Sequence, residues 1–378
     1  MTNRKVRVAH ESRMPGKKGS LRRLVAALLL TAAAALAAVC LTACTAADSS
    51  TDTSSESNIT KLHRASLLTE REAEEENPLN PDSTLSVPTD VKKIGEIWFI
   101  VDCYHDRIIY HENLEDPLTS WRVMTDEISR GHTVASDGIV YLADDTEQNR
   151  VLIFEQEDGA FVMTQVFEEI GDRPHEILYR EEDKTFYCWS SESGEMFLFR
   201  RDDADDRVYL EEIRRVPLLA GTYVRSFTVT DRAGEDEIWF VSGTPTSAGY
   251  AENYAPSVVV CDLDTFSVKE TWPVADEMAG MVQITPIDGW LYVTISTDST
   301  GDQGAADLIR ARTPQDLAEG SVEHLYREYF EGGGTPYIIR RIEDCWYLAE
   351  HRSNRDAVWS FSADDGGIRD AKRLYPQE

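Results

Sequence analysis

The stretch Gly95-Glu96-Ile97-Trp98-Phe99-Ile100 decides the fold, because close copies of it recur along the chain. It is a run of β-branched and aromatic residues, which favours a strand, and most copies follow an acidic or Asp-Gly turn signal. The clearest copy is Asp137-Gly138-Ile139-Val140-Tyr141-Leu142. Further copies share this pattern: Phe186-Tyr187-Cys188-Trp189, Glu237-Ile238-Trp239-Phe240-Val241, Asp288-Gly289-Trp290-Leu291-Tyr292-Val293 and Cys345-Trp346-Tyr347-Leu348.

A second strand-like run follows most copies after a turn, as in Arg107-Ile108-Ile109-Tyr110, and an outer run precedes the next copy. Six such units of about 48 residues each, with no long helix between them, match the size of a propeller blade. We therefore predict an all-β fold over residues 89–378, a six-bladed β-propeller with four antiparallel strands per blade. A β-sandwich, a pair of smaller β domains, or a ring of five or seven blades are the alternatives.

The first 43 residues are expected to be a lipoprotein signal peptide. A basic stretch ending in Arg22 and Arg23 precedes an apolar run from Leu24 to Leu41, which is typical of a secretory signal. The ending Leu41-Thr42-Ala43-Cys44 resembles the lipobox of bacterial lipoproteins, and this resemblance implies lipidation of Cys44. It places the protein at the cell membrane, facing outside the cytoplasm. A transmembrane anchor is the alternative, since about 18 apolar residues just span a bilayer.

Residues 44–88 are expected to form a tether between the lipidated cysteine and the folded domain. Residues 45–58 are almost exclusively Thr, Ser, Asp, Glu and Ala, a composition that does not fold. A short helix is predicted over residues 61–76. Prolines at 78, 81 and 88 mark the approach to the propeller.

The charge of the chain excludes some partners. The formal net charge is −30, with 38 basic and 68 acidic residues. Eight of the basic residues and one acidic residue precede Cys44, so 30 bases and 67 acids remain after it. Such a surface repels phosphate backbones and anionic headgroups, so no nucleic-acid partner is expected and membrane attachment should come from the acyl chains.

The cysteines indicate buried thiols rather than a disulfide framework or a metal site. Cys40 lies in the signal peptide and Cys44 is the lipidation site. The remaining four cysteines are Cys103, Cys188, Cys261 and Cys345. They are widely spaced without a CxxC pattern, so we expect them to be unpaired and to bind no structural zinc.

Counting back from each repeat locates the start of the innermost strand, which lines the central channel of a propeller. The Asp-Gly pairs at 137 and 288 set the register in blades two and five, and in blade one the best match is Asp90. These positions predict a polar ring at one mouth of the channel, formed by His132, His175, Arg225, Gln283 and Tyr337. Their imidazole, guanidinium, amide and hydroxyl groups suit a small-ligand site, but they also suit solvated side chains or bonds between blades.

Two long insertions, residues 242–257 and 296–307, join second and third strands and are expected at the same end as this ring. Aspartates in the second insertion raise the hypothesis of calcium binding, although their spacing is not that of an EF-hand. His105 and His351 end second strands in adjacent blades and are expected near the same rim.

The strand starts Gly131-His132-Thr133-Val134 and Pro174-His175-Glu176-Ile177 are similar to the signatures of streptogramin-lyase-like propellers. The chain also resembles the six-bladed propellers of the NHL-repeat and gluconolactonase type over most of residues 90–378. The resemblance implies the propeller fold. It does not carry the lactonase or lyase activity, because the Glu, Asn and Asp ligands of the lactonase metal have no counterparts here and only two blades carry the histidine.

Three functions are compatible with these features. The leading one is a lipid-anchored extracytoplasmic module that binds a small polar or anionic ligand, or a protein partner, at the channel mouth. The second is a lyase or hydrolase in which His132 and His175 act as acid and base and Arg225 stabilises negative charge. The third is a non-catalytic envelope scaffold. No cofactor is expected, since the chain has no P-loop, dinucleotide fingerprint, HExxH or nucleophile elbow.

Overall fold

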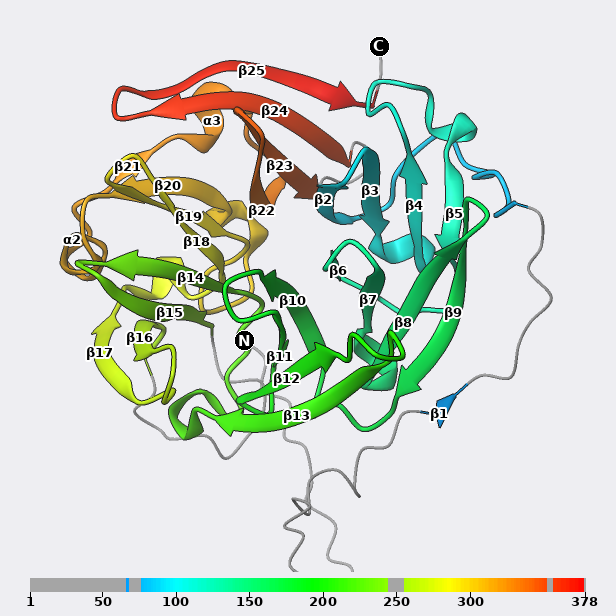
Figure 1. Cartoon of the computed structure of the whole chain (residues 1–378). Coiled ribbons are helices and arrows are strands. Elements are labelled where there is room, and N and C mark those ends of the chain that lie inside the picture. The colour runs from blue at the N-terminus through cyan, green and yellow to red at the C-terminus, as the bar shows by residue number, and fades with distance from the viewer. Residues whose placement is uncertain (1–65, 68–75, 244–254, 352–355, 377–378) are drawn as a thin grey trace, which may run out of the picture. The chain divides into compact units, whose positions relative to one another are not determined.

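The structure, a computed structural model, describes residues 66–67, 76–243, 255–351 and 356–376, which all belong to one compact unit, Glu56–Glu378. Six antiparallel sheets surround a central axis, so the predicted six-bladed propeller is confirmed (Figure 1). The innermost strands are β2 (Pro88–Ile94), β6 (Val134–Ser136), β10 (Pro174–Arg180), β14 (Phe227–Arg232), β18 (Met281–Ile287) and β22 (Thr335–Ile342).

The other strands follow in chain order within each blade. Blade 1 adds β3 (Ile97–Asp102), β4 (Arg107–His111) and β5 (Arg122–Thr125), and blade 2 adds β7 (Val140–Asp145), β8 (Arg150–Glu157) and β9 (Ala160–Phe167). Blade 3 adds β11 (Thr185–Ser190), β12 (Glu195–Arg201) and β13 (Val208–Arg215), and blade 4 adds β15 (Glu235–Ser242), β16 (Ser257–Asp262) and β17 (Val268–Pro273). Blade 5 adds β19 (Trp290–Ile295), β20 (Asp307–Ala311) and β21 (Glu323–His324), and blade 6 adds β23 (Cys345–His351), β24 (Ala357–Asp364) and β25 (Gly367–Tyr375).

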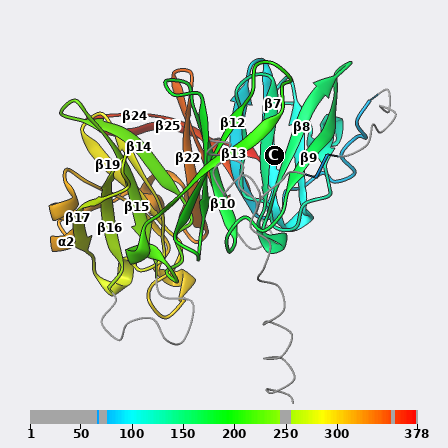
Figure 2. The ribbon, with the colours of Figure 1, turned by 60° about the horizontal axis from the view of Figure 1, so that its bottom comes forward.

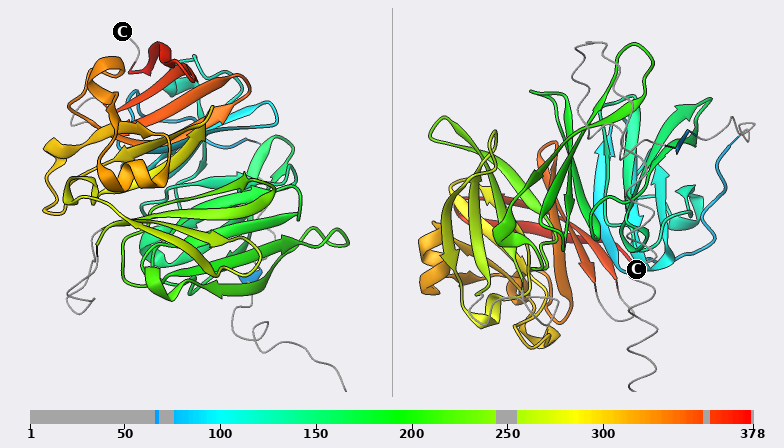
Figure 3. Two further views of the ribbon diagram at one scale, coloured as in Figure 1. Left: turned by 90° about the vertical axis from the view of Figure 1, so that its left-hand side faces the viewer. Right: turned by 90° about the horizontal axis from the view of Figure 1, so that it is seen from below.

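The described helices are short. The six-residue helix α2 (Pro314–Glu319) and the four-residue helix α3 (Tyr326–Tyr329) both follow β20, where the outer strand β21 has only two residues. Views turned away from the propeller axis place α2 at the outside of the ring (Figures 2 and 3). No helix within the described ranges is long and apolar enough to cross a membrane.

The hydrophobic core lies between the blades. Six buried clusters fill the six blade-to-blade contacts, because each sheet packs one face against the next sheet. Cys188 lies in the cluster between blades 2 and 3, and Cys261 in the one between blades 3 and 4. All four cysteines of the described ranges are free thiols, which confirms that prediction.

The ring closes without exchange of a strand between the first and last blades. Val358, Leu374 and Tyr375 of blade 6 pack in one cluster with Trp121 of blade 1, and the Tyr375 hydroxyl donates to the Asp116 carbonyl at 2.7 Å. Closure therefore rests on side-chain packing and on ion pairs such as Arg340 with Asp90.

The region before the propeller is only partly described. The signal peptide, Cys44 and most of the tether lie outside the described residues, so the lipidation site stays a prediction. Within the segment expected to be helical, Ser66–Leu67 instead form the two-residue strand β1, which pairs with Gln165 and Val166 of β9. The expected helix is therefore wrong at those two residues.

Candidate functional site

Strand pairing aligns the six innermost strands residue by residue. Each strand start carries one residue at the channel mouth and the next residue one step deeper. The equivalent mouth positions are Thr89, His132, His175, Arg225, Val282 and Tyr337, and the equivalent deeper positions are Asp90, Thr133, Glu176, Ser226, Gln283 and Ile338.

The predicted ring was therefore wrong by one residue in blades 1 and 5. Asp90 and Gln283 lie at the deeper level, and Gln283 is 4% exposed and accepts a hydrogen bond from the Ile339 amide at 2.7 Å. The error has a physical cause in the hairpins. The hairpins of blades 2 and 5 have the same length, since Val134 pairs with Ala143 and Ile284 with Val293. The Asp-Gly pair, however, stands three residues after Val134 and four residues after Ile284, so counting back from it shifts the register by one.

Four aromatic side chains meet at the mouth. The imidazoles of His132 and His175 stack with their ring centroids 3.6 Å apart, and the Tyr337 ring stacks on His351 at 4.3 Å. The Tyr337 hydroxyl lies 3.3 Å from His132 Nδ1 and 3.2 Å from His175 Nε2, so it can donate to one imidazole and accept from the other. The structure thus brings together three residues of the predicted ring.

These histidines are neutral at pH 7. Burial holds the pKa values of His132 and His175 well below their usual range, and the nearby charges of Arg173 and Arg225 lower them further. Burial likewise lowers the pKa of His351 to about 3 and raises that of Tyr337 well above its usual value. Positive charge at the mouth therefore comes from arginines rather than from imidazolium groups.

A cavity of about 500 Å³ opens at this mouth, lined by His132, Arg225, Tyr337 and His351 together with Arg130, Arg173 and Tyr223. His351 is thus placed at the rim as predicted, whereas His105 bonds to Asp102 Oδ2 at 2.7 Å and does not line this cavity. A cavity of this size is typical of small-molecule sites.

Sequence reasoning missed Arg130 and Arg173, which occupy equivalent positions two residues before His132 and His175. Both have a left-handed backbone, with φ of 58° and 63°. The amide of Arg130 donates to Asp106 Oδ1 at 2.9 Å, and that of Arg173 donates to Asn149 Oδ1 at 2.8 Å. The preceding blade therefore holds each arginine at the mouth.

Aromatic rings orient the guanidinium groups. The Arg130 guanidinium lies 3.8 Å from the centre of the Tyr104 ring, and that of Arg225 lies 4.5 Å from the centre of the Tyr223 ring. Stacking of this kind fixes the plane of the guanidinium and leaves its N–H edge available to a ligand.

Several polar atoms of the cavity residues have no hydrogen-bond partner. Seven buried side-chain nitrogen or oxygen atoms of the described residues lack one, and three of them belong to the lining: Arg130 Nη1, Arg173 Nε and His351 Nε2. Because a buried polar atom without a partner is costly, three in one cavity indicate groups that a ligand can satisfy.

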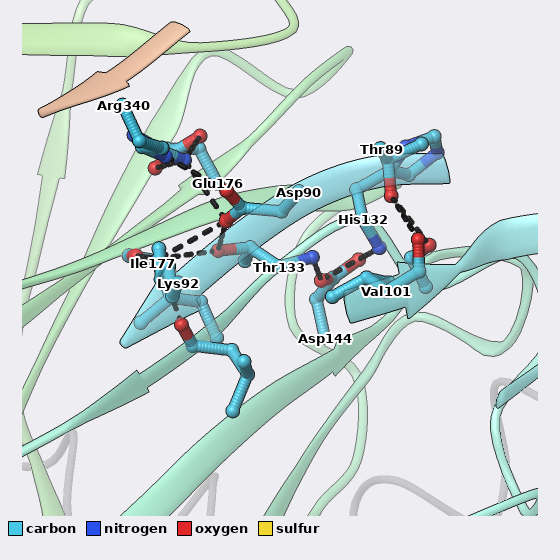
Figure 4. Close-up of polar contacts among 12 residues, drawn as sticks. Thr89, Asp90, Lys92, Val101, His132, Thr133, Asp144, Glu176, Ile177 and Arg340 are labelled. Carbon is cyan, nitrogen blue, oxygen red and sulfur yellow. Dashed lines mark hydrogen bonds and ion pairs between the residues drawn. The ribbon is translucent and has the colours of Figure 1, made fainter. Parts of the chain in front are cut away.

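An ion network lies one level below the mouth (Figure 4). Arg340 of blade 6 donates to both oxygens of Asp90, at 2.8 and 3.1 Å, and to both oxygens of Glu176, at 2.8 and 3.0 Å. Lys92 Nζ lies 3.2 Å from Asp90 Oδ2 and donates to Thr133 Oγ1 at 2.9 Å. The network joins blades 1, 2, 3 and 6 across the channel.

The two acids of this network differ in their electrostatics. Burial alone would raise the pKa of Asp90, but the charges of Arg340 and Lys92 outweigh it and hold that pKa below its ordinary value. Burial raises the pKa of Glu176, and Arg340 only partly offsets the effect. Lys92 contacts Asp90 directly, which explains why the two acids shift in opposite directions.

Asp144 at the end of β7 positions His132. Its Oδ1 accepts from the backbone amides of His132 at 3.0 Å and Thr133 at 2.6 Å (Figure 4). Its Oδ2 accepts from Thr146 Oγ1 at 2.7 Å. Burial raises the pKa of Asp144 to about 8, against the lowering effect of these bonds. The carboxyl thereby fixes the strand start that carries His132.

The second predicted insertion contributes Ser296, Thr297 and Gln303 to the cavity lining. Its Asp298 carboxylate caps its own turn, accepting from the Thr300 amide at 2.7 Å. Nowhere in the described ranges do three or more His, Cys, Asp or Glu side chains cluster in a way that would hold a metal ion. Most of the first insertion lies outside the described residues.

Comparison with known proteins supports the fold. The sequence matches no protein-family model and no curated protein. Among solved structures, a candidate 6-phosphogluconolactonase from Bacteroides uniformis is similar with a TM-score of 0.52 and 12% identity, over 79% of this chain and 86% of that one. Streptogramin B lyase is similar with a TM-score of 0.50 and 13% identity, over 80% and 87% of the two chains. Likeness at such low identity establishes the propeller fold alone, which confirms the architectural resemblance.

Proposed function

We propose that the protein is a lipid-anchored extracytoplasmic module whose propeller binds a small anionic ligand at the channel mouth. The observation that carries this proposal is the convergence of Arg130, Arg173 and Arg225 on one cavity in a chain whose net charge is −30. Within the described residues, two of these arginines each have a buried nitrogen atom that lacks a hydrogen-bond partner. Arginine is the side chain best suited to hold carboxylate or phosphate groups.

Binding is tested on the full mature chain purified in detergent. Carboxylate and phosphate compounds and their uncharged analogues are screened for an increase in melting temperature, and hits are titrated by calorimetry. We expect anions alone to stabilise the protein and Arg225→Gln to weaken their binding at least tenfold, the size of one charge-assisted contact. Arg215→Gln is the matched control, because Arg215 is 72% exposed on β13 and is not among the residues that line the cavity. Absence of binding by every anion at millimolar concentration would refute the proposal.

The anchor is tested separately. Cys44→Ser should prevent acylation, leaving the signal peptide uncleaved and the mature, lipidated form absent from the membrane fraction. Mass spectrometry of the wild-type protein should find an acylated peptide that begins at Cys44. An unmodified Cys44 in a chain that retains residues 1–43 would instead support the transmembrane alternative.

An enzyme is the second candidate. Its support is the contact of Tyr337 with both His132 and His175, since neutral imidazoles beside a phenol can accept and return a proton. Turnover of an anion found in the screen, lost in both His132→Ala and His175→Ala, would favour catalysis. Binding without turnover would favour the module, and neither binding nor turnover would leave a protein partner or a scaffold role.

A further inference from the structure

The charge balance around the cavity points to a particular class of anion. Arg173 has acidic partners, since its Nη1 donates to Glu147 Oε1 at 2.8 Å and its Nε lies 3.8 Å from Glu192 Oε1. Among the residues that the structure describes, the acidic partner of Arg130 is a distant one, with Asp106 Oδ1 4.0 Å from its Nε. For Arg225 the described residues provide a weak bond to the Met281 carbonyl at 3.4 Å and no carboxylate.

Within the described residues Arg130 and Arg225 therefore lack a close carboxylate partner, although Asp356 also lines the cavity, and the two arginines come from different blades. Arg130 precedes β6 in blade 2, and Arg225 precedes β14 in blade 4, while blade 3 lies between them. A single negative charge can compensate one of these guanidinium groups and leaves the other uncompensated in a partly enclosed space. Two negative charges on one molecule compensate both, and a guanidinium pairs with a carboxylate or phosphate through two parallel bonds.

From this geometry we infer that the mouth selects small dianions, with one negative group held by Arg130 and the other by Arg225. The inference rests on the proposed function and narrows its ligand class. Arg173 lies between these two sites in the order of blades and supplies a donor toward the middle of the ligand. The stacking of Arg130 on Tyr104, and of Arg225 on Tyr223, orients both clamps before the ligand arrives, which lowers the entropy lost on binding.

Tyr104 has a positioning role in this arrangement. It is 56% exposed, which is unusual for so large an aromatic side chain, and its ring covers the Arg130 guanidinium. Its backbone amide bonds to the Ser86 carbonyl at 2.9 Å, so its place does not depend on the arginine. Removal of the ring should therefore loosen Arg130 without disturbing the fold.

The test compares linear dicarboxylates with their monomethyl esters, which have nearly the same shape but one negative charge. The probes are malonate, succinate, glutarate and adipate, titrated by calorimetry into the full mature chain. We expect the best diacid to bind at least tenfold more tightly than its own monoester, because it gains one further charge-assisted contact. The chain length that binds best measures the separation of the two arginines.

Variants assign the two clamps. Arg130→Gln and Arg225→Gln should each reduce the advantage of the diacid over the monoester to less than threefold, and Tyr104→Ala should reduce it partly while leaving the melting temperature unchanged. The control Arg215→Gln should leave the advantage intact. Equal binding of diacid and monoester, both sensitive to Arg225→Gln, would overturn the dianion inference while the anion site stands. An advantage that survives Arg130→Gln would overturn the assignment of Arg130, and no binding of any anion in the whole screen would remove both proposals.

Discussion

Arg340 provides a sharp test of the ion network beneath the mouth. In Arg340→Met the unbranched apolar side chain replaces the methylene stem of the arginine, and all four contacts to Asp90 and Glu176 are lost. Asp90 retains Lys92 at 3.2 Å and the Thr133 hydroxyl at 3.1 Å. Glu176 loses the only hydrogen-bond donor that the described part of the chain gives its carboxylate.

One buried carboxylate is thus left without compensation, and such a loss costs about 3–5 kcal/mol at pH 7. For a domain of this size the melting temperature should fall by about 10 °C. The assay is urea denaturation at pH 7, followed by tryptophan fluorescence, with calorimetry for the melting temperature. Because the orphaned Glu176 carries the cost, the double variant Arg340→Met/Glu176→Gln should recover at least half of the lost free energy of unfolding.

The control for this experiment is Arg215→Met, which removes an exposed arginine and should change the free energy of unfolding by less than about 0.5 kcal/mol. The cost of Arg340→Met should also shrink toward pH 4, where Glu176 takes up a proton instead of being buried as an anion. A loss below about 1 kcal/mol at pH 7, or a double variant no more stable than the single one, would refute the reasoning.

Three further predictions concern acid, packing and thiols. His175 is 2% exposed, and burial holds its pKa well below 6.5 in the folded protein. Below pH 6.5 the unfolded chain therefore binds more protons at this residue than the folded protein does. The contribution of His175 to the free energy of unfolding is fully present above pH 6.5 and falls by about 2 kcal/mol at pH 5. Urea denaturation at pH 7 and 5 should therefore show a smaller pH effect in His175→Asn, and an unchanged effect would contradict the assignment. Gly280→Ala would put a Cβ 2.4 Å from the Thr297 carbonyl oxygen and should lower the free energy of unfolding by about 1–3 kcal/mol. The control Gly366→Ala should be nearly neutral, because its Cβ would meet only a flexible carboxylate at 3.1 Å. Equal losses of stability in the two variants would be inconsistent with this packing. Burial raises the pKa of the Cys188 thiol, so it should react with a thiol reagent only as fast as the chain unfolds, and fast labelling of the native protein would contradict its burial.

The fold could be predicted from sequence because its signal is local and repeated. Each blade begins with an aromatic and β-branched hairpin, and the copies at Ile97, Val140 and Trp290 all form second strands. Six copies fix the architecture even where one is weak, as in blade 5 with its two-residue outer strand.

The candidate site was predicted only in part, because its parts depend on register and on distant contacts. An Asp-Gly pair marks a turn but does not reveal which positions of the hairpin it occupies, so Gln283 was placed one level too high. The network around Arg340 joins residues up to 250 positions apart, and no local pattern signals such a pair. Arg130 and Arg173 did leave a signal, since each stands two residues before a histidine at a strand start.

The central claim is that the arginines of the channel mouth hold an anion, and selenate tests it most directly. Crystals of the protein soaked in selenate, a dianion with a strong anomalous signal, should show a selenium peak in the cavity, with the selenate oxygens accepting hydrogen bonds from Arg130, Arg173 or Arg225. The same soak of Arg225→Gln crystals should show a weaker peak or none. Selenium found only at exposed arginines such as Arg215, with the cavity empty, would contradict the account.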